Sequence, residues 1–572
     1  MEKNENNINS SFIRNKGDFV FMISHKNELI TLNKVTIASD SRKIRIFLNG
    51  VIYNNNEDQL IEGFQSQGID YIKQIEGSFV IFLMVGTQFY ILTDRVNSKK
   101  AFYVFIENVW YVSNNIDALP KDKCHLSLDG IACYLANGAM FNDLTLFQEI
   151  RSANRASVTS FVNGQISVQS YWDFKFEYSA GSIFQQSQYQ KELELLLIES
   201  VKRRYDPALK TAISLSSGYD SRAILGILRN KIIAPNISCI SYALTDNPKQ
   251  DTDADVAKEL SAQCGYPHQV LVSYKGNLID QLKNNAKEGK CLSNFCDELD
   301  AWHTLAASNQ FSELFVGDEF FGWSNLAQES KENLLESVKI FGASGISRLE
   351  PYLSKKIYHQ LRQCLNKLTD DIYEKTNAIP DDNDKEDFLY LDQRINHVLM
   401  PWREFFSSQV GFVHNPFMDG TILEFMQKLP PHLRQNKSFY LKTIKYMFPD
   451  LFSINKATSS GHEVNWQEEL QNQKGSLILL IQDTDSRLDE VISKKEVMDL
   501  INGKGSILTK IKTFTLTKLQ LLGRKNTFVD KLLRKLLTVP GLYQKGSSIP
   551  RDKLILRLFL IRIYLSPSSL DN

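Results

Sequence analysis

One short stretch of the chain combines small residues, hydroxyls and a carboxylate in a pattern suited to binding an anion. It is Ser214-Leu215-Ser216-Ser217-Gly218-Tyr219-Asp220-Ser221-Arg222, set between a β-type run at 211–213 and an apolar, helix-like run at 223–228. Where a strand turns into a helix in this way, free backbone N–H groups point at a bound anion. Hydroxyls at Ser216, Ser217 and Ser221 add donors, and Asp220 is placed to hold a metal ion beside a phosphate. The alternative is an ordinary strand-to-helix turn with a capping serine.

A second acidic pair, Asp318-Glu319, is expected to reach the same place. Strands alternate here with helix-like segments, which predicts an α/β fold with helices on both faces of a parallel sheet. Ligands of such sheets bind beyond the carboxyl ends of the strands, where Asp220 and Asp318 both fall. We therefore expect one shared site; taken alone, Asp318-Glu319 would indicate a solvated acidic turn. The expected strands are 211–213, 237–244, 270–272 and 313–316, and the expected helices are 185–204 and 253–263.

These motifs resemble the signatures of the asparagine synthetase family of adenylating enzymes. Residues 216–221 resemble its pyrophosphate loop Ser-Gly-Gly-x-Asp-Ser, with Ser217 in place of the first glycine. Residues 317–322, Gly-Asp-Glu-Phe-Phe-Gly, resemble its second acidic motif. Pro416-Phe417-Met418-Asp419, followed by Glu424-Phe425 and Leu429-Pro430-Pro431, resembles its late helical motif. The resemblance implies that ATP and magnesium are the cofactors.

The same resemblance implies a role for each residue of the expected site. Lys456, in the polar segment 454–461, matches a lysine that stabilises the acyl-transfer intermediate, and it joins Asp318 and Glu319 as the expected catalytic residues. Arg222 either adds positive charge near the phosphates or points into solvent. Asp220 and Asp318 would hold magnesium, and the nucleotide and its pyrophosphate would contact Leu215, Ser216, Ser217, Gly218, Asp220, Ser221 and Ser241.

The amino-terminal third is expected to form a separate, strand-rich domain. Its β-type runs at 19–23, 44–48, 79–85, 89–92 and 109–112, with one helix-like interval at 58–67, predict packed antiparallel sheets with helices. Asn49-Gly50-Val51-Ile52-Tyr53-Asn54, Glu76-Gly77-Ser78-Phe79, Asp94-Arg95 and Tyr171-Trp172-Asp173 resemble the glutaminase domain of the same family, which has an Ntn-hydrolase-like sandwich fold.

We expect this glutaminase-like domain to be inactive. The family's nucleophile is an amino-terminal cysteine whose own α-amino group serves as the base, whereas the first cysteine here is Cys124. The expected organisation is a polar extension at 1–16, a degenerate glutaminase-like domain at 17–178 and a synthetase domain at 179–572. The synthetase domain would be α/β, of the adenine-nucleotide α-hydrolase-like (PP-loop) type, with a helical carboxyl-terminal part. The clearest helices of that part are expected at 388–410 and 422–429, and a charged loop is expected at 381–387.

The expected function is ATP-dependent formation of an amide bond without glutamine hydrolysis. Asparagine-forming members carry a glutamate that handles ammonia just before the Asp-Glu pair, and Phe315 stands at that position. The acyl donor would be a small-molecule, peptide or glycan carboxylate, as in relatives such as β-lactam synthetases and the macrolactam synthetases of lasso peptides. The alternatives are an ammonia-dependent asparagine synthetase and a non-catalytic scaffold that binds nucleotide or peptide.

Composition agrees with a cytoplasmic globular protein. Of 572 residues 43% are hydrophobic, and 66 Lys and Arg balance 66 Asp and Glu, so the charge points to no nucleic-acid partner. The seven cysteines are odd in number and lack the spacing of a zinc site, which indicates reduced thiols. No apolar run is long enough for a transmembrane segment. Residues 501–572 are basic, and the run 554–565 indicates a docked terminal helix with snorkelling arginines or a segment for an acidic or membrane surface.

Overall fold

The computed structural model describes residues 13–24, 29–32, 37–39, 44–162, 165–178, 183–320, 322, 330–504 and 548–567. Four of the features expected from the sequence lie wholly or partly outside these residues. They are the polar extension at 1–16, the domain boundary at 178–179, Phe321 of the acidic motif, and residues 505–547 and 568–572 of the basic carboxyl-terminal region.

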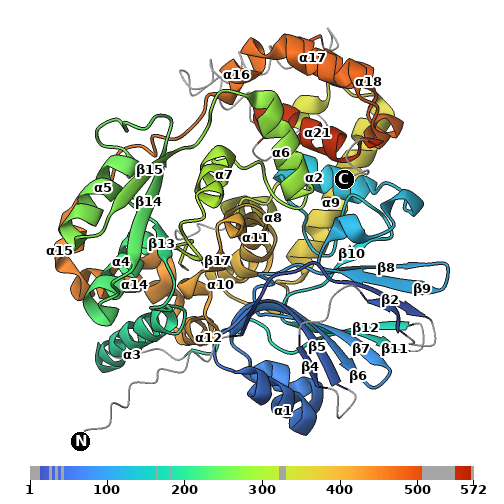
Figure 1. Ribbon diagram of the computed structural model, residues 1–572. Coiled ribbons are helices and arrows are strands. Elements are labelled where there is room, and N and C mark those ends of the chain that lie inside the picture. The colour runs from blue at the N-terminus through green and yellow to red at the C-terminus, as the bar shows by residue number, and fades with distance from the viewer. Residues whose placement is uncertain are drawn as a thin grey trace, which may run out of the picture.

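The amino-terminal part is a sandwich of two antiparallel sheets, as the sequence predicts (Figure 1). The first sheet has the order β1 (Ile13–Asn15), β5 (Ile44–Ile52), β6 (Gly77–Val85), β7 (Gln88–Thr93), β11 (Ser157–Val162) and β12 (Gln165–Ser170), and β4 (Ile37–Ser39) also pairs with β5. The second has the order β10 (Arg151–Ser152), β8 (Phe102–Ile106), β9 (Val109–Ser113), β2 (Val20–Ser24) and β3 (Leu29–Leu32).

Alternation along β5 shows why these residues form a sandwich. Successive side chains of a strand point to opposite faces. Phe47 therefore packs between the two sheets, with its ring centroid 5.1 Å from that of Phe21 on β2. Its neighbours Ile46 and Leu48 face the other way and pack with α1 (Glu57–Gln67). The outer face of the second sheet packs toward α2 (Leu128–Asn137) in the main core, so the layers run helix, sheet, sheet, helix.

The following part contains the expected parallel sheet, whose first three strands along the chain are drawn in green on the left of Figure 1. Its order is β15 (His268–Val272), β14 (Ile237–Ala243), β13 (Thr211–Ser214), β16 (Glu313–Val316) and β17 (Phe412–His414). Alternate residues of β13 enter two different cores, Ile213 with α4 (Tyr219–Ile227) and Ala212 with α7 (Leu299–Ala307). Helices thus cover both faces, and α3 (Ile183–Lys202), α5 (Asp253–Cys264) and α6 (Leu278–Gly289) complete this part.

The remainder is mostly helical, with two differences from the sequence-based expectation. The predicted helix over 388–410 is several segments: the end of α10 (Asp382–Leu389), a π-helical stretch η6 (Tyr390–Leu399), α11 (Met400–Phe405) and the short η7 (Ser407–Gln409). The predicted charged loop at 381–387 is wrong, because the Asp381 side chain accepts from the backbone N–H groups of Asn383 and Asp384 and so caps α10. The other main helices are α8 (Lys331–Ser337), α9 (Lys355–Glu374), α12 (Gly420–Lys428), α13 (Pro431–Arg434), α14 (Ser438–Met447), α15 (Pro449–Ser453), α16 (Trp466–Asn472), α17 (Lys474–Asp483) and α18 (Lys494–Asn502).

The terminal helix α21 (Arg551–Tyr564) is docked against the body of the protein, beside α2 and α6 (Figure 1). Its arginines do not snorkel as expected. Arg557 is buried and donates to the Leu135 carbonyl, and Arg562 is 1% exposed and donates to the carbonyls of Ile481 and Thr484. The helix therefore belongs to the core, where both arginines donate to backbone carbonyls and Arg562 also forms an ion pair with Asp489.

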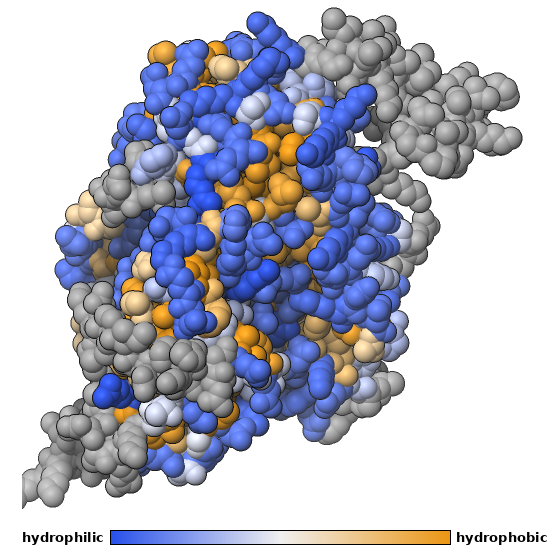
Figure 2. All heavy atoms as spheres, turned by 90° about the vertical axis from the view of Figure 1, so that its right-hand side faces the viewer, coloured by the Kyte–Doolittle hydropathy of each residue, from blue (hydrophilic) through white to orange (hydrophobic). Residues whose placement is uncertain are grey.

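The surface gives no sign of a membrane-spanning element in the part of the chain described. No helix there combines the length and the apolar character that crossing a bilayer requires. Figure 2 shows the face on the right of Figure 1, where hydrophilic side chains cover most of the surface around an apolar area. All seven cysteines are unpaired.

Candidate active site

In the loop after β13, the backbone N–H groups of Ser216, Ser217 and Gly218 all donate to nearby side chains. The Ser216 N–H donates to the Ser221 hydroxyl at 3.2 Å, and the Gly218 N–H donates to the Ser216 hydroxyl at 3.1 Å. The Ser217 N–H donates to a carboxylate oxygen of Asp253, the first residue of α5, at 3.0 Å. The first N–H groups of α4 have no acceptor within the helix, so they remain the donors for an anion at this turn.

Gly317 brings the acidic motif onto the start of α4. Because β13 and β16 are neighbours in the sheet, the segments that follow them meet at its carboxyl edge. A Cβ at Gly317 would lie 2.5 Å from the Ser221 backbone nitrogen, so only glycine permits this approach. The Phe320 N–H then donates to the Asp220 carboxylate at 3.3 Å. The loop after β13 and the acidic motif therefore meet at the carboxyl edge of the sheet, as expected.

Asp220 forms an ion pair through one of its two carboxylate oxygens. Its Oδ2 accepts from the Lys437 ammonium at 3.0 Å, and the buried Tyr440 hydroxyl lies beside the same carboxylate, whose buried Oδ1 meets no well-aligned donor in the described residues. Lys437 and its neighbour Asn436 both have left-handed backbone, with φ of 56° and 53°. Sequence reasoning missed Lys437, because nothing in its surroundings marks a lysine 217 residues from Asp220 as a partner.

Both carboxylate oxygens of Asp318, unlike those of Asp220, accept hydrogen bonds from side chains. The Arg403 guanidinium of α11 donates to both oxygens. The Nε atom lies 3.1 Å from Oδ1 and 3.0 Å from Oδ2, and a terminal nitrogen lies 2.5 Å from Oδ1. Asn415, just after β17, donates its amide to the same carboxylate at 3.0 Å. Both oxygens of this expected metal ligand are therefore engaged by side chains of the protein.

Glu319, the third expected acidic residue, faces the π-helical stretch η6. It accepts from the Tyr390 hydroxyl at 3.0 Å and pairs with Arg394 at 3.4 Å. Burial acts to raise the pKa of Glu319, but the charge and hydrogen bonds of Arg394 and the Tyr390 hydroxyl outweigh it and lower that pKa below its usual value. Glu319 is thus an ionised partner of η6.

Lys456 lies across an open cleft from the loop. The cleft is open to solvent and is lined by Ser216, Ser217, Gly218, Asp253 and residues 456–460. The Lys456 ammonium sits 4.2 Å from the centroid of the Tyr219 ring, which holds it by a cation–π contact. The structure therefore brings Lys456 and the loop together as the sequence predicts, although more than 200 residues separate them.

Arg222 ties the segment before Lys456 to α4. It is fully buried and donates to three carbonyls, Leu451 at 3.1 Å, Ile454 at 2.5 Å and Asn455 at 2.9 Å. Neither expectation for Arg222 is correct, since it reaches neither the phosphate side nor solvent. It sets the position of the Lys456 segment relative to the loop.

Two of the expected nucleotide contacts lie in the interior. Leu215 is buried and its N–H donates to the Ile240 carbonyl, so it contributes backbone geometry. Ser241 is buried on β14, and its hydroxyl is 2.9 Å from Nε2 of His268. Neither is among the residues that line the cleft beside Lys456. Their contact with a nucleotide stays a prediction.

The carboxylates of the site differ in how well they suit a magnesium ion. Asp220 fits, because its buried Oδ1 meets no well-aligned donor in the described residues and sits next to the anion-binding turn. Asp318 does not fit as it stands, because Arg403 and Asn415 take both oxygens. No cluster of three or more His, Cys, Asp or Glu ligands occurs among the described residues. Phosphate oxygens and water would have to supply most of the ion's ligands.

Comparison with known proteins identifies one domain. Residues 192–302, which include β13, the loop and β14, match the family model described as Asparagine synthase, and that family uses ATP and magnesium. No curated protein matches. One solved structure, described as the allosteric regulatory enzyme of purine biosynthesis, has 6% identity over 45% of this chain and 75% of that chain, with a TM-score of 0.19. Another, glutamine phosphoribosylpyrophosphate amidotransferase from B. subtilis with ADP and GMP, has 8% identity over 45% and 85%, with a TM-score of 0.21. Residues 192–302 therefore form a domain of the asparagine synthase type.

Proposed function

We propose that this protein adenylates a substrate carboxylate with ATP and passes the acyl group to an amine or to ammonia, without hydrolysing glutamine. A carboxylate oxygen attacks the α-phosphorus, the bond between the α-phosphorus and its bridging oxygen breaks, and pyrophosphate leaves. The amine nitrogen then attacks the acyl carbon, AMP leaves, and the amine proton passes to solvent. The observation that carries the proposal is the cleft shared by the loop and Lys456.

The described side chains divide this work between binding and charge stabilisation. The turn into α4 would hold the pyrophosphate part of ATP, with the hydroxyls of Ser216 and Ser221 beside it. Asp220 would hold magnesium, which neutralises phosphate charge when bound. Lys437 would then exchange its bond to Asp220 for one to a phosphate oxygen. Lys456, held over Tyr219, is placed to stabilise negative charge that develops at the acyl carbon.

The cysteines of the sandwich support the absence of glutamine hydrolysis. Burial raises the pKa of Cys124 to about 11 and that of Cys133 to about 12. The thiolate is the nucleophilic form, and at neutral pH these two residues are almost entirely thiol. The sandwich would then serve as a scaffold for the synthetase part, which it contacts through buried pairs such as Arg155 with Asp392 and Tyr53 with His414.

Two alternatives remain to be separated by experiment. Ammonia-dependent asparagine synthesis is disfavoured by Phe315, which is fully buried and packs 5.1 Å from the His414 ring, so this position offers no carboxylate to orient ammonium. A non-catalytic scaffold is favoured by one observation, that Asp220 and Asp318 are both ion-paired within the protein.

The test is pyrophosphate-dependent exchange into ATP with pooled candidate carboxylates. We expect exchange that requires a carboxylate and falls at least about 100-fold in Asp220→Ala. Asp450→Ala is the matched control, because Asp450 forms a half-exposed ion pair with Arg229 and does not line the cleft. Exchange with aspartate alone, together with asparagine formed from ammonium, would establish the ammonia-dependent alternative. No exchange and no magnesium-ATP binding would establish the scaffold.

A further inference from the structure

One helical run carries the side chains that hold two carboxylates of the candidate active site. The π-helical stretch η6 continues into α11 without a break. Tyr390 and Arg394 of η6 bind Glu319, and Arg403 of α11 binds Asp318. Because Asp318 and Glu319 are neighbours in the chain, one helix holds both only where its turns bring these three side chains to one place.

The sandwich also binds this helical run. Arg155 pairs with Asp392 of η6 at 2.8 Å. Lys100 lies in the loop between β7 and β8 and is 4% exposed. Its ammonium donates to the backbone carbonyl of Asn396 at 2.8 Å and to the side-chain oxygen of the same residue at 3.0 Å. Its backbone N–H donates to the Glu404 carboxylate at 3.0 Å. Lys100 therefore contacts both η6 and α11.

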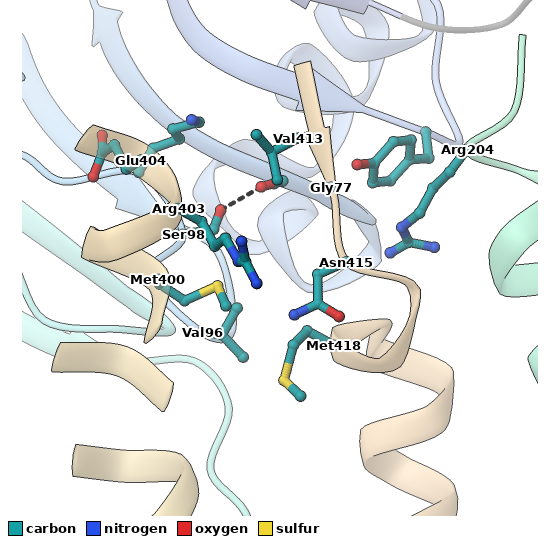
Figure 3. A pocket seen from close by; sticks show the side chains of 13 residues that line it. Gly77, Val96, Ser98, Arg204, Met400, Arg403, Glu404, Val413, Asn415 and Met418 are labelled. Atoms are coloured by element: carbon teal, nitrogen blue, oxygen red, sulfur yellow. Dashed lines mark hydrogen bonds between the residues drawn. The ribbon is translucent and has the colours of Figure 1, made fainter. Parts of the chain in front are cut away.

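Neighbouring residues of α11 serve the two parts of the protein. Arg403 donates to Asp318, and Glu404 accepts from the Lys100 N–H. Figure 3 shows the two side chains leaving the helix in different directions, with the Arg403 guanidinium toward Asn415 and the Glu404 carboxylate turned away from it. Since one residue of an α-helix corresponds to a turn of about 100°, the register of the helix decides which side chain faces which part.

Lys100 supplies a hydrogen bond that the π register leaves open. The Met400 N–H donates to the Ile395 carbonyl, five residues back, and not to Asn396, four residues back. The next residue, Pro401, has no N–H. The Asn396 carbonyl thus has no donor from either of these residues, and a buried carbonyl without a donor costs free energy. The Lys100 ammonium is the donor that it receives.

The competing register is an ordinary α-helix. In that register the Met400 N–H would donate to the Asn396 carbonyl, which would then need no donor from the sandwich. Each residue from Met400 onward would be turned by about 100° relative to η6. Arg403 would then leave Asp318 while η6 keeps its bonds to Glu319. The π register is therefore the one that serves both carboxylates.

We propose that Lys100 of the sandwich is a positioning residue of the synthetase site, because it stabilises the π register in which one helix holds Asp318 and Glu319 together. The sandwich thereby sets the geometry of a site that lies in the other part of the chain. The effect on catalysis rests on the proposed function. The effect on the register does not.

Hydrogen exchange of the amides between 395 and 404 in the full-length protein tests the register. Lys100→Met keeps much of the side-chain volume but leaves the Asn396 carbonyl without its donor. Pro401 opposes the α register, because its ring would meet the His397 carbonyl, so neither register is then fully bonded. We expect these amides to exchange hydrogen at least about tenfold faster than in wild type, since two hydrogen bonds from a cation are lost.

Lys121→Met is the matched control for the loss of a buried ammonium. Lys121 is 5% exposed, and its ammonium donates to Asp117 and Tyr564 and not to η6. We expect hydrogen exchange over 395–404 to stay within about threefold of wild type in this control. Equal hydrogen exchange over 395–404 in Lys100→Met and Lys121→Met would overturn the proposal.

Pyrophosphate exchange into ATP tests the effect on the site. We expect Lys100→Met to lower kcat at least about tenfold, since misplacing a group of the site by about 1 Å can cost about 100-fold. KM for ATP should stay within about threefold, because Lys100 is not among the residues that line the cleft beside Lys456. Unchanged kcat in Lys100→Met, with hydrogen exchange over 395–404 increased, would overturn the positioning role.

Combining Lys100→Met with Pro401→Ala separates positioning from stability. The two changes remove both features that favour the π register, and an N–H at position 401 completes an α-helix. We expect hydrogen exchange over 395–404 to return to within about threefold of wild type, while kcat stays low because Arg403 no longer meets Asp318. Recovery of kcat together with the protection would overturn the proposal. The combined variant keeps the test valid where Lys100→Met alone fails to fold.

Failure of the proposed function has a different outcome from failure of this proposal. Absence of pyrophosphate exchange in wild type would refute the proposed function. The comparison of hydrogen exchange in Lys100→Met and Lys121→Met would then still decide whether Lys100 holds the register.

Discussion

Replacing Arg222 by methionine tests whether the position of Lys456 depends on a buried clamp on α4. The side chain is fully buried and donates to the carbonyls of Leu451, Ile454 and Asn455. Methionine retains much of the volume but none of the donors. With about 1 kcal/mol of net stabilisation for each lost hydrogen bond, the segment loses about 3 kcal/mol of local stability. One tenfold step corresponds to about 1.4 kcal/mol, so local opening should become about 150-fold more frequent.

Hydrogen exchange of the amides between 451 and 458 measures this opening directly, without requiring the whole chain to unfold in one step. Arg229→Gln is the matched control, because Arg229 binds the same segment through Asp450 at 3.0 Å but is half-exposed, which limits its contribution to about 0.5 kcal/mol. We expect a large increase of exchange in Arg222→Met and little change in Arg229→Gln. Equal exchange in the two variants would refute the clamp.

Three further predictions concern the cleft and its support. Lys456→Met should lower acyl transfer about 100-fold, measured as amide product, while magnesium-ATP binding stays within about threefold, because Lys456 is exposed and rests on Tyr219. Asp253→Asn should strengthen ATP binding about fivefold in calorimetry, because it removes a negative charge from the Ser217 N–H while leaving an acceptor; weaker binding would contradict this. Burial, with the charge of Lys258, lowers the pKa of His268 to about 4. The unfolded chain therefore binds more protons between about pH 6.5 and about pH 4, stability falls as the pH drops through this window, and His268→Gln should flatten that part of a thermal-stability profile.

The sheets could be predicted from sequence because their signal is local. Apolar runs such as 79–85 and 237–244 correspond to β6 and β14, and the order of strands and helices fixes a parallel sheet with its carboxyl edge at Asp220 and Asp318. Strand β17 could not be predicted from its local sequence. It has three residues, and it is a strand because Phe412 and Val413 pair with β16 rather than because of their own pattern.

The partners of the site could not be predicted, for a related physical reason. Lys437 pairs with Asp220 and Arg403 pairs with Asp318, each from an element far away in the sequence. The residues around an isolated Lys or Arg do not indicate which carboxylate it pairs with in the fold. Arg222 shows the same limit. An arginine at the start of a helix can point into solvent, toward a phosphate or into the core. Here Arg222 lies in the core because it donates to carbonyls of the distant segment 451–455.

The proposed function requires that a carboxylate becomes bonded to the α-phosphorus of ATP. The most direct test is to incubate the protein, ATP and magnesium with a pool of amines and with carboxylates labelled by oxygen-18. The mass of the AMP formed is then measured by mass spectrometry. An acyl-adenylate leaves one carboxylate oxygen on AMP when the acyl group is transferred, so we expect labelled AMP in wild type and none in Asp220→Ala. Amide product with unlabelled AMP, or with ADP in its place, would contradict adenylation.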